Sequence, residues 1–145
     1  MTPTVPIVLN GLARTMLMDL APQVTVAYAG QTLQLAGALS MMIAQEFDRA
    51  AARLVEENAA VERLLADAAD VIADRELSRL AAAREPSLLV SALQARNREL
   101  RAALTRLHAH IETQDTAAAR DLETRIWAEL AESTRRRLLD MAMPS

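Results

Sequence analysis

The longest regular pattern in the chain is an apolar repeat whose steps alternate between four and three residues. It runs from Ile43 to Val71, and Glu57 is its only polar member. This spacing places the repeat on one face of a helix, and about four heptads of it are typical of helices that pack side by side. No proline interrupts residues 23–85. We therefore expect one long helix over residues 22–74, with the repeat as its core face.

Two shorter apolar repeats follow Pro86, a residue that disfavours helix immediately before it. The first predicts a helix over residues 87–112, with Asn97 as the only polar residue of its seam. The second predicts a helix over residues 115–141. Its expected inward positions are Ala119, Leu122, Ile126, Leu130, Leu138 and Met141. Short connections make these helices antiparallel neighbours on the long helix, while residues 74–84 either continue that helix or form a short one.

The N-terminal residues are expected to form an extended arm over residues 1–9, because Pro3 and Pro6 occur there. Asn10 is a good N-cap for a short helix that ends near Leu20. Ala and Leu dominate the apolar residues, aromatic residues make up only 2%, and there are three glycines. This composition favours helices over strands. We expect an all-α, up-and-down helical bundle with one long central helix and a short N-terminal helix, in a single domain of 145 residues.

An uncharged segment is the most unusual feature of the chain, since no Asp, Glu, Lys, Arg or His lies between Asp19 and Glu46. Soluble proteins rarely leave so long an apolar surface facing water. We expect a second copy of the chain to cover this segment, which makes the protein a twofold homodimer. The expected interface residues are Val26, Gly30, Leu33, Gly37, Met41 and Ala44.

Two alternatives to the homodimer follow from the same segment. A break near Gly30 or Gly37 would fold the N-terminal part back over the bundle and leave a monomer. The segment is also long enough to span a bilayer. Gln23, Gln31 and Gln34 within it, and the lack of an arginine cluster beside it, argue against a membrane helix.

Glu57 and Asn97 each interrupt an otherwise apolar seam. A buried polar residue at such a position can fix the register of packed helices and their oligomeric state. The alternative is a pocket between helices, close to the methionines, that binds a small polar ligand with Arg96 or Arg101 as counter-charge. The candidate ligand-binding residues are therefore Glu57, Asn97, Arg96 and Arg101.

The sequence predicts no catalytic residue, no metal site and no cofactor. His108 and His110 point about 200° apart on a helix, so they cannot share one ion. His108 and Glu112 have the spacing to present two ligands from one helix face, but no second ligand cluster stands out. The chain has no cysteine, and it contains no phosphate-binding loop or catalytic triad motif. An enzyme is therefore the less favoured class.

The net charge is −3, so the chain offers no broad positive field to nucleic acid. The chain contains no lysine, and all of its 16 Lys/Arg residues are arginine. This bias is typical of a GC-rich bacterial genome. No secretory signal is evident, and we expect a cytoplasmic protein. The predicted function is a non-catalytic, homo-oligomeric helical bundle that acts as a structural or protein-interaction module, with itself or another helical protein as partner. The alternative is a small-molecule-binding or sensing bundle that uses the pocket described above.

Overall fold

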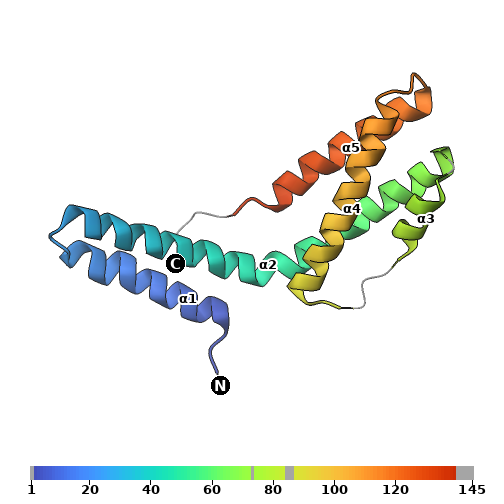
Figure 1. The fold of residues 1–145 in the computed structure, drawn as a ribbon. Coiled ribbons are helices and arrows are strands. Elements are labelled where there is room, and N and C mark those ends of the chain that lie inside the picture. The colour runs from blue at the N-terminus through green and yellow to red at the C-terminus, as the bar shows by residue number, and fades with distance from the viewer. Residues whose placement is uncertain (1, 73, 84–86, 140–145) are drawn as a thin grey trace. The chain divides into compact units, whose positions relative to one another are not determined.

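The computed structural model describes residues 2–72, 74–83 and 87–139 (Figure 1). All regular structure in these ranges is helical, which confirms the all-α bundle predicted from the composition. The α-helices are α1 (Val5–Arg14), α2 (Ala27–Ile72), α3 (Arg75–Ala82), α4 (Val90–Ile111) and α5 (Ala117–Arg136). None of the helices in the described ranges has the length and apolar character needed to cross a membrane.

The contacts divide the chain into two compact units, which are described separately. Unit 1 comprises Met1–Ala50 and Leu139–Ser145, and unit 2 comprises Ala51–Leu138. Helix α2 contributes its first part to unit 1 and its second part to unit 2. That the whole chain folds as one cooperative domain stays a prediction.

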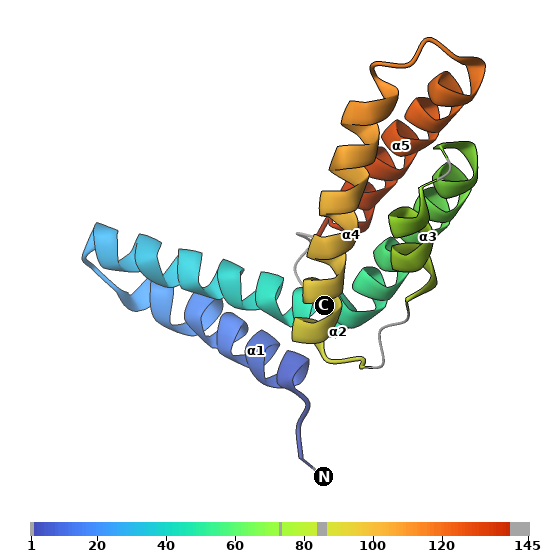
Figure 2. The ribbon, with the colours of Figure 1, turned by 45° about the vertical axis from the view of Figure 1, so that its right-hand side comes forward.

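Unit 1 is a helical hairpin in which α1 lies beside the first part of α2 (Figures 1 and 2). A π-helical turn (Thr15–Leu20) and a 3-10 turn (Ala21–Gln23) extend α1 before the chain reverses. Helix α1 begins at Val5, so the extended arm expected over residues 1–9, and the helix start at Asn10, are wrong. Pro6 lies in the first turn of α1, where a missing N–H removes no intrahelical hydrogen bond.

The long helix begins at Ala27 rather than at Pro22. Pro22 belongs to the 3-10 turn, and Val24 follows in an extended conformation with φ −84° and ψ 115°. The chain therefore reverses ahead of α2. Gly30 and Gly37, where the sequence suggested a break, both lie inside α2.

Gly37 marks a close approach between the two arms of the hairpin. A Cβ atom at this position would lie 2.6 Å from Cγ of Leu17 and 3.2 Å from the carbonyl oxygen of Ala13. Both distances are shorter than ordinary van der Waals contact. Ala13 is itself almost fully buried. The small residues at these two positions therefore let α1 and the π-helical turn after it, which we call the N-terminal helical arm, lie directly against α2.

Unit 2 packs α3, α4 and α5 with the second part of α2. Helices α4 and α5 lie side by side in both views and are joined by residues 112–116, as the short connection predicts (Figures 1 and 2). Asp74 caps α3 as a separate short helix, because its Oδ1 accepts from the backbone N–H groups of Glu76 and Leu77 at 2.8 and 3.2 Å. The main hydrophobic core of this unit contains Val61, Leu64, Leu65, Ala68, Ala69, Leu77, Leu100, Ala103, Leu104, Leu107, Ile111, Ala119, Leu122 and Ile126.

The apolar repeat of the long helix faces the interior only over its middle. Its members from Ala50 to Ala68 are buried, but Phe47 and Val71 are more than half exposed. At the other end of the bundle, α5 ends at Arg136 and Leu138 is 67% exposed, so the inward position expected for Leu138 is wrong. The helix expected to run to about Met141 therefore ends earlier than predicted, and Met141 itself falls outside the described residues.

Candidate functional site

A buried carboxylate lies among three helices of unit 2. Glu57 on α2 has no exposed surface, in agreement with its position in the apolar seam. Arg137, which directly follows α5, donates from Nε to Oε1 at 3.0 Å and from Nη2 to Oε2 at 2.6 Å. Arg101 on α4 donates to Oε2 at 3.3 Å, and the Ser133 hydroxyl of α5 donates to Oε1 at 3.2 Å. Both carboxylate oxygens are therefore satisfied by side chains from other helices.

The charge state of Glu57 follows from these contacts. Burial alone would raise the pKa of Glu57, because it disfavours the charged form. The hydrogen bonds and positive charge of Arg137, the charge of Arg101 and the hydrogen bond from Ser133 outweigh burial and hold the pKa below its ordinary value. Glu57 is thus an ionised group at neutral pH, buried with its counter-charges.

Asn97 extends this network along α4. Its Nδ2 donates to Oδ1 of Asn58 at 2.8 Å and to Glu57 Oε2 at 3.4 Å, and its Oδ1 accepts from Nε of Arg101 at 3.1 Å. Asn58 in turn donates to the backbone carbonyl of Leu93 at 3.2 Å. The two polar residues that interrupt the predicted seams therefore meet in one layer of hydrogen bonds.

Arg96 belongs to a different cluster, although the sequence grouped it with Glu57. Its guanidinium pairs with Glu62 at 3.0 Å and also donates to the backbone carbonyls of Leu80 and Ala83. These carbonyls lie at the end of α3, where the last residues of a helix have no intrahelical donor. Arg96 therefore fastens the end of α3 to α2 and α4.

The network around Glu57 is closed in its present form. A polar ligand at Glu57 would have to displace Arg137, Arg101 or Ser133, each of which already satisfies the carboxylate. Ser133 and Arg137 are not among the residues that the sequence predicts for this site. A usable signal exists, because the inward spacing of α5 continues from Leu130 by three and then four residues to these two positions. The arrangement is suited to fixing how three helices pack.

The second candidate site is an apolar stripe on α2 in unit 1, which we call the outward stripe. Its members follow steps of seven, four, four and four residues and so share one side of the helix. They are Tyr28, Leu35, Leu39, Ile43 and Phe47, which are 80%, 61%, 46%, 55% and 58% exposed. By helical geometry, the stripe lies on the side of α2 away from Gly37, which faces the N-terminal helical arm. Helix α2 is thus apolar on two opposite sides, and its own hairpin covers one of them.

The structure distributes the predicted interface residues over both covered and uncovered surface. Gly37 packs against Leu17 of its own chain. Met41 and Ala44 are buried, while Gly30 and Leu33 are half-buried. Val26 is 63% exposed and remains available to a partner. Much of the face that the sequence assigned to a second copy is therefore already occupied within unit 1.

Neither family models nor curated proteins nor solved structures give a match to this chain.

Proposed function

We propose that the protein is a non-catalytic self-association module, in which the outward stripe of unit 1 packs against the same surface of a second copy. The observation that carries this proposal is the exposure of five large apolar side chains along one side of a helix whose first charged residue is Glu46. Exposed apolar surface of this extent is typical of protein interfaces. Burying it releases roughly 25 cal/mol for each Å² removed from water.

A second copy is the partner that best fits the chemistry of this surface. A surface without charges gains little from a charged partner, whose polar groups would lose water without finding counterparts. The outward stripe is itself uncharged and apolar, so two copies related by a twofold axis complement each other. Two hairpins brought together in this way would form a four-helix arrangement.

In this proposal unit 2 is a rigid helical body, and its buried polar network fixes the packing of its helices rather than binding a ligand. The Glu57 network is complete without a ligand, and breaking such a buried network is costly. A satisfied polar layer specifies one packing arrangement of α2, α4 and α5. The small-molecule alternative has no comparable observation in its favour.

Cysteine labelling tests the proposal, because the natural chain has no cysteine. A thiol introduced by Leu39→Cys lies on the outward stripe, whereas one introduced by Gln34→Cys lies on an exposed position of α2 away from it. We expect the thiol at position 39 to react slowly with a bulky maleimide at high protein concentration and faster on dilution. The thiol at position 34 should react at one rate throughout. Equal, concentration-independent rates at both positions would rule out self-association through this stripe.

A further inference from the structure

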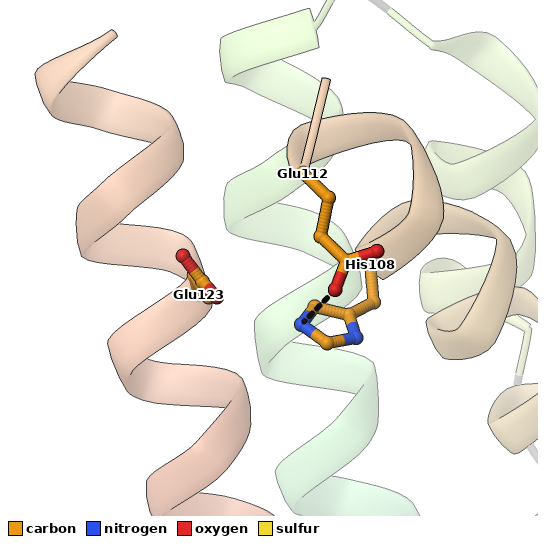
Figure 3. Close-up of side chains that lie close together, drawn as sticks. All are labelled: His108, Glu112 and Glu123. Carbon is orange, nitrogen blue, oxygen red and sulfur yellow. Dashed lines mark ion pairs between the residues drawn. The ribbon is translucent and has the colours of Figure 1, made fainter. Parts of the chain in front are cut away.

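Three potential metal ligands converge between α4 and α5 in unit 2. His108 and Glu112 lie one turn apart on α4, and Glu123 reaches toward them from α5 (Figure 3). One ligand atom from each of the three side chains lies within 4.8 Å of the others. The pair on α4 was visible in the sequence, but the third ligand comes from a helix that begins after a turn, and no spacing rule connects it to the first two.

One ring nitrogen of His108 lacks a hydrogen-bond partner. Its Nε2 is buried, and its nearest carboxylate oxygen, Oε1 of Glu112, lies at 3.7 Å, an ion-pair contact too long for a hydrogen bond (Figure 3). A buried polar atom without a partner costs free energy, so such an atom calls for an explanation. This atom is the one that a metal ion would bind.

The two carboxylates also differ from several other glutamates of this unit. Glu57, Glu62 and Glu129 each pair with an arginine. Within the described residues, neither Glu112 nor Glu123 forms an ion pair with an arginine, and both converge on the histidine instead. Two carboxylates close to an imidazole nitrogen without a hydrogen-bond partner provide the negative charge that a divalent cation neutralises.

We infer that His108, Glu112 and Glu123 form a binding site for a divalent transition-metal ion of the zinc or cobalt class. One nitrogen and two carboxylate oxygens suit these ions, whereas Mg²⁺ and Ca²⁺ prefer oxygen ligands alone. Three protein ligands leave a fourth position for water, as in open zinc sites. The 4.8 Å spread exceeds the separation of roughly 3.5 Å between ligand atoms on one tetrahedral zinc ion. His108 and Glu112 are already 3.7 Å apart, so closing this spread takes rotation of the partly exposed Glu123 side chain toward them.

The fluorescence of Trp127 can be used to detect binding at this site. The ring of Trp127 meets that of His108 edge to face, with centroids 5.4 Å apart and planes at 88°. Trp127 is the only tryptophan of the chain, so its fluorescence reports on this place alone. Cobalt(II) bound to His108 would quench that fluorescence, and zinc(II), which does not quench in the same way, would reverse the quenching by displacement.

The experiment is a titration of the intact protein with CoCl₂ followed by ZnCl₂, with Mg²⁺ as a comparison. We expect saturable quenching at one ion per chain, reversal by zinc and no response to Mg²⁺. Glu123→Gln, a partly exposed position that keeps the histidine ring beside Trp127, should weaken binding by at least tenfold. His110→Ala serves as the matched control, because His110 is exposed and lies outside the cluster, and it should bind as the natural chain does.

A second measurement separates loss of the site from loss of folding. Zinc should raise the melting temperature of the natural protein and of His110→Ala, because an ion that ties α4 to α5 binds only the folded state. Glu112→Gln and Glu123→Gln should keep their metal-free melting temperatures and lose the increase. Absence of saturable binding to the natural chain would overturn the inference. Equal binding by Glu123→Gln and the natural chain would do so as well.

Discussion

Arg137 binds the buried carboxylate of Glu57 through both of its oxygens, with Nη2 to Oε2 at 2.6 Å and Nε to Oε1 at 3.0 Å. The two residues lie 80 positions apart in the chain. A bidentate pair of this kind is stronger and more specific in direction than a single hydrogen bond. It fixes the end of α5 against the middle of α2, and Arg101 and Ser133 add α4 and the body of α5 to the same point.

Removing the charge of Glu57 should destabilise unit 2. Glu57→Gln leaves Arg137 and Arg101 beside a neutral amide, and we expect a loss of about 3 kcal/mol in the free energy of unfolding. Denaturant unfolding followed by Trp127 fluorescence measures it within this unit. The control is Glu76→Gln, since Glu76 is 70% exposed and pairs with Arg106 only at 3.8 Å. Its effect should stay within about 0.5 kcal/mol, and equal effects of both variants would contradict this account of the network.

The same network predicts acid sensitivity. The pKa of Glu57 is lowered in the folded protein from an ordinary value of 4.5. A carboxyl group with a lowered pKa contributes stability that is complete above its unfolded value and is lost as the pH falls toward the folded value. The natural protein should therefore lose stability below pH 4.5, and its advantage over Glu57→Gln should shrink with falling pH.

The comparison with Glu57→Gln isolates this one group. The pKa of Glu132 is also lowered, by its hydrogen bond from Arg135, but Glu132 is present in both proteins and its contribution cancels. Unfolding curves at a series of pH values give the difference directly. A constant difference between the two proteins from neutral pH to well below 4.5 would show that folding does not lower the pKa of Glu57, and would contradict this prediction.

Replacing Asn97 by an apolar residue of similar size should destabilise unit 2, although its seam is otherwise apolar. Asn97→Leu leaves Asn58 without the donor to its Oδ1 and Arg101 without the acceptor for its Nε. We expect a loss of about 2 kcal/mol, since buried polar atoms that lose a partner are costly. Gln94→Leu, at an exposed position of the same helix, should change little. A more stable Asn97→Leu protein would mean that the hydrogen bonds of this layer contribute nothing net.

Gly37 and Gly11 provide a test of the hairpin. Gly37→Ala places a Cβ atom 2.6 Å from Leu17 and should destabilise unit 1 by about 1–3 kcal/mol. Gly11→Ala meets no atom within 4 Å and should instead stabilise α1, by about 0.5–1 kcal/mol. Hydrogen exchange of the α1 amides measures both changes, and exchange in α4 and α5 should not respond. If Gly37→Ala slows exchange in α1 as Gly11→Ala does, the close approach at Leu17 is absent.

The sequence predicts the helical class and most of the core because both depend on local composition and periodicity. The interruptions at Glu57 and Asn97 were visible as polar residues in apolar seams, and both belong to one network. Their partners were harder to find, since Arg137 lies 80 residues from Glu57 and an arginine at a helix end is ordinarily solvated. Only the continued inward spacing of α5 points to Ser133 and Arg137. That spacing places both residues on the inward side of the helix, but it does not identify Glu57 as the residue they contact.

The uncharged segment shows a different limit. Its lack of charge predicts that it needs cover, but periodicity alone does not say which side of α2 the same chain covers. That depends on where the chain reverses, and Pro22 was compatible with both a helix start and a turn. Because the reversal occurs ahead of Ala27, the N-terminal helical arm covers Gly37, and the side that carries Leu39 stays exposed.

The most direct test of self-association through the outward stripe is the mass of the protein in solution, measured by light scattering. The natural chain should give twice its chain mass of 15.8 kDa. Leu39→Glu, which places a charge in the stripe, should give a single chain, and Gln34→Glu, which places the same charge elsewhere on α2, should stay dimeric. A natural chain of 15.8 kDa at high micromolar concentration would contradict the account, as would a dimer that Leu39→Glu leaves intact.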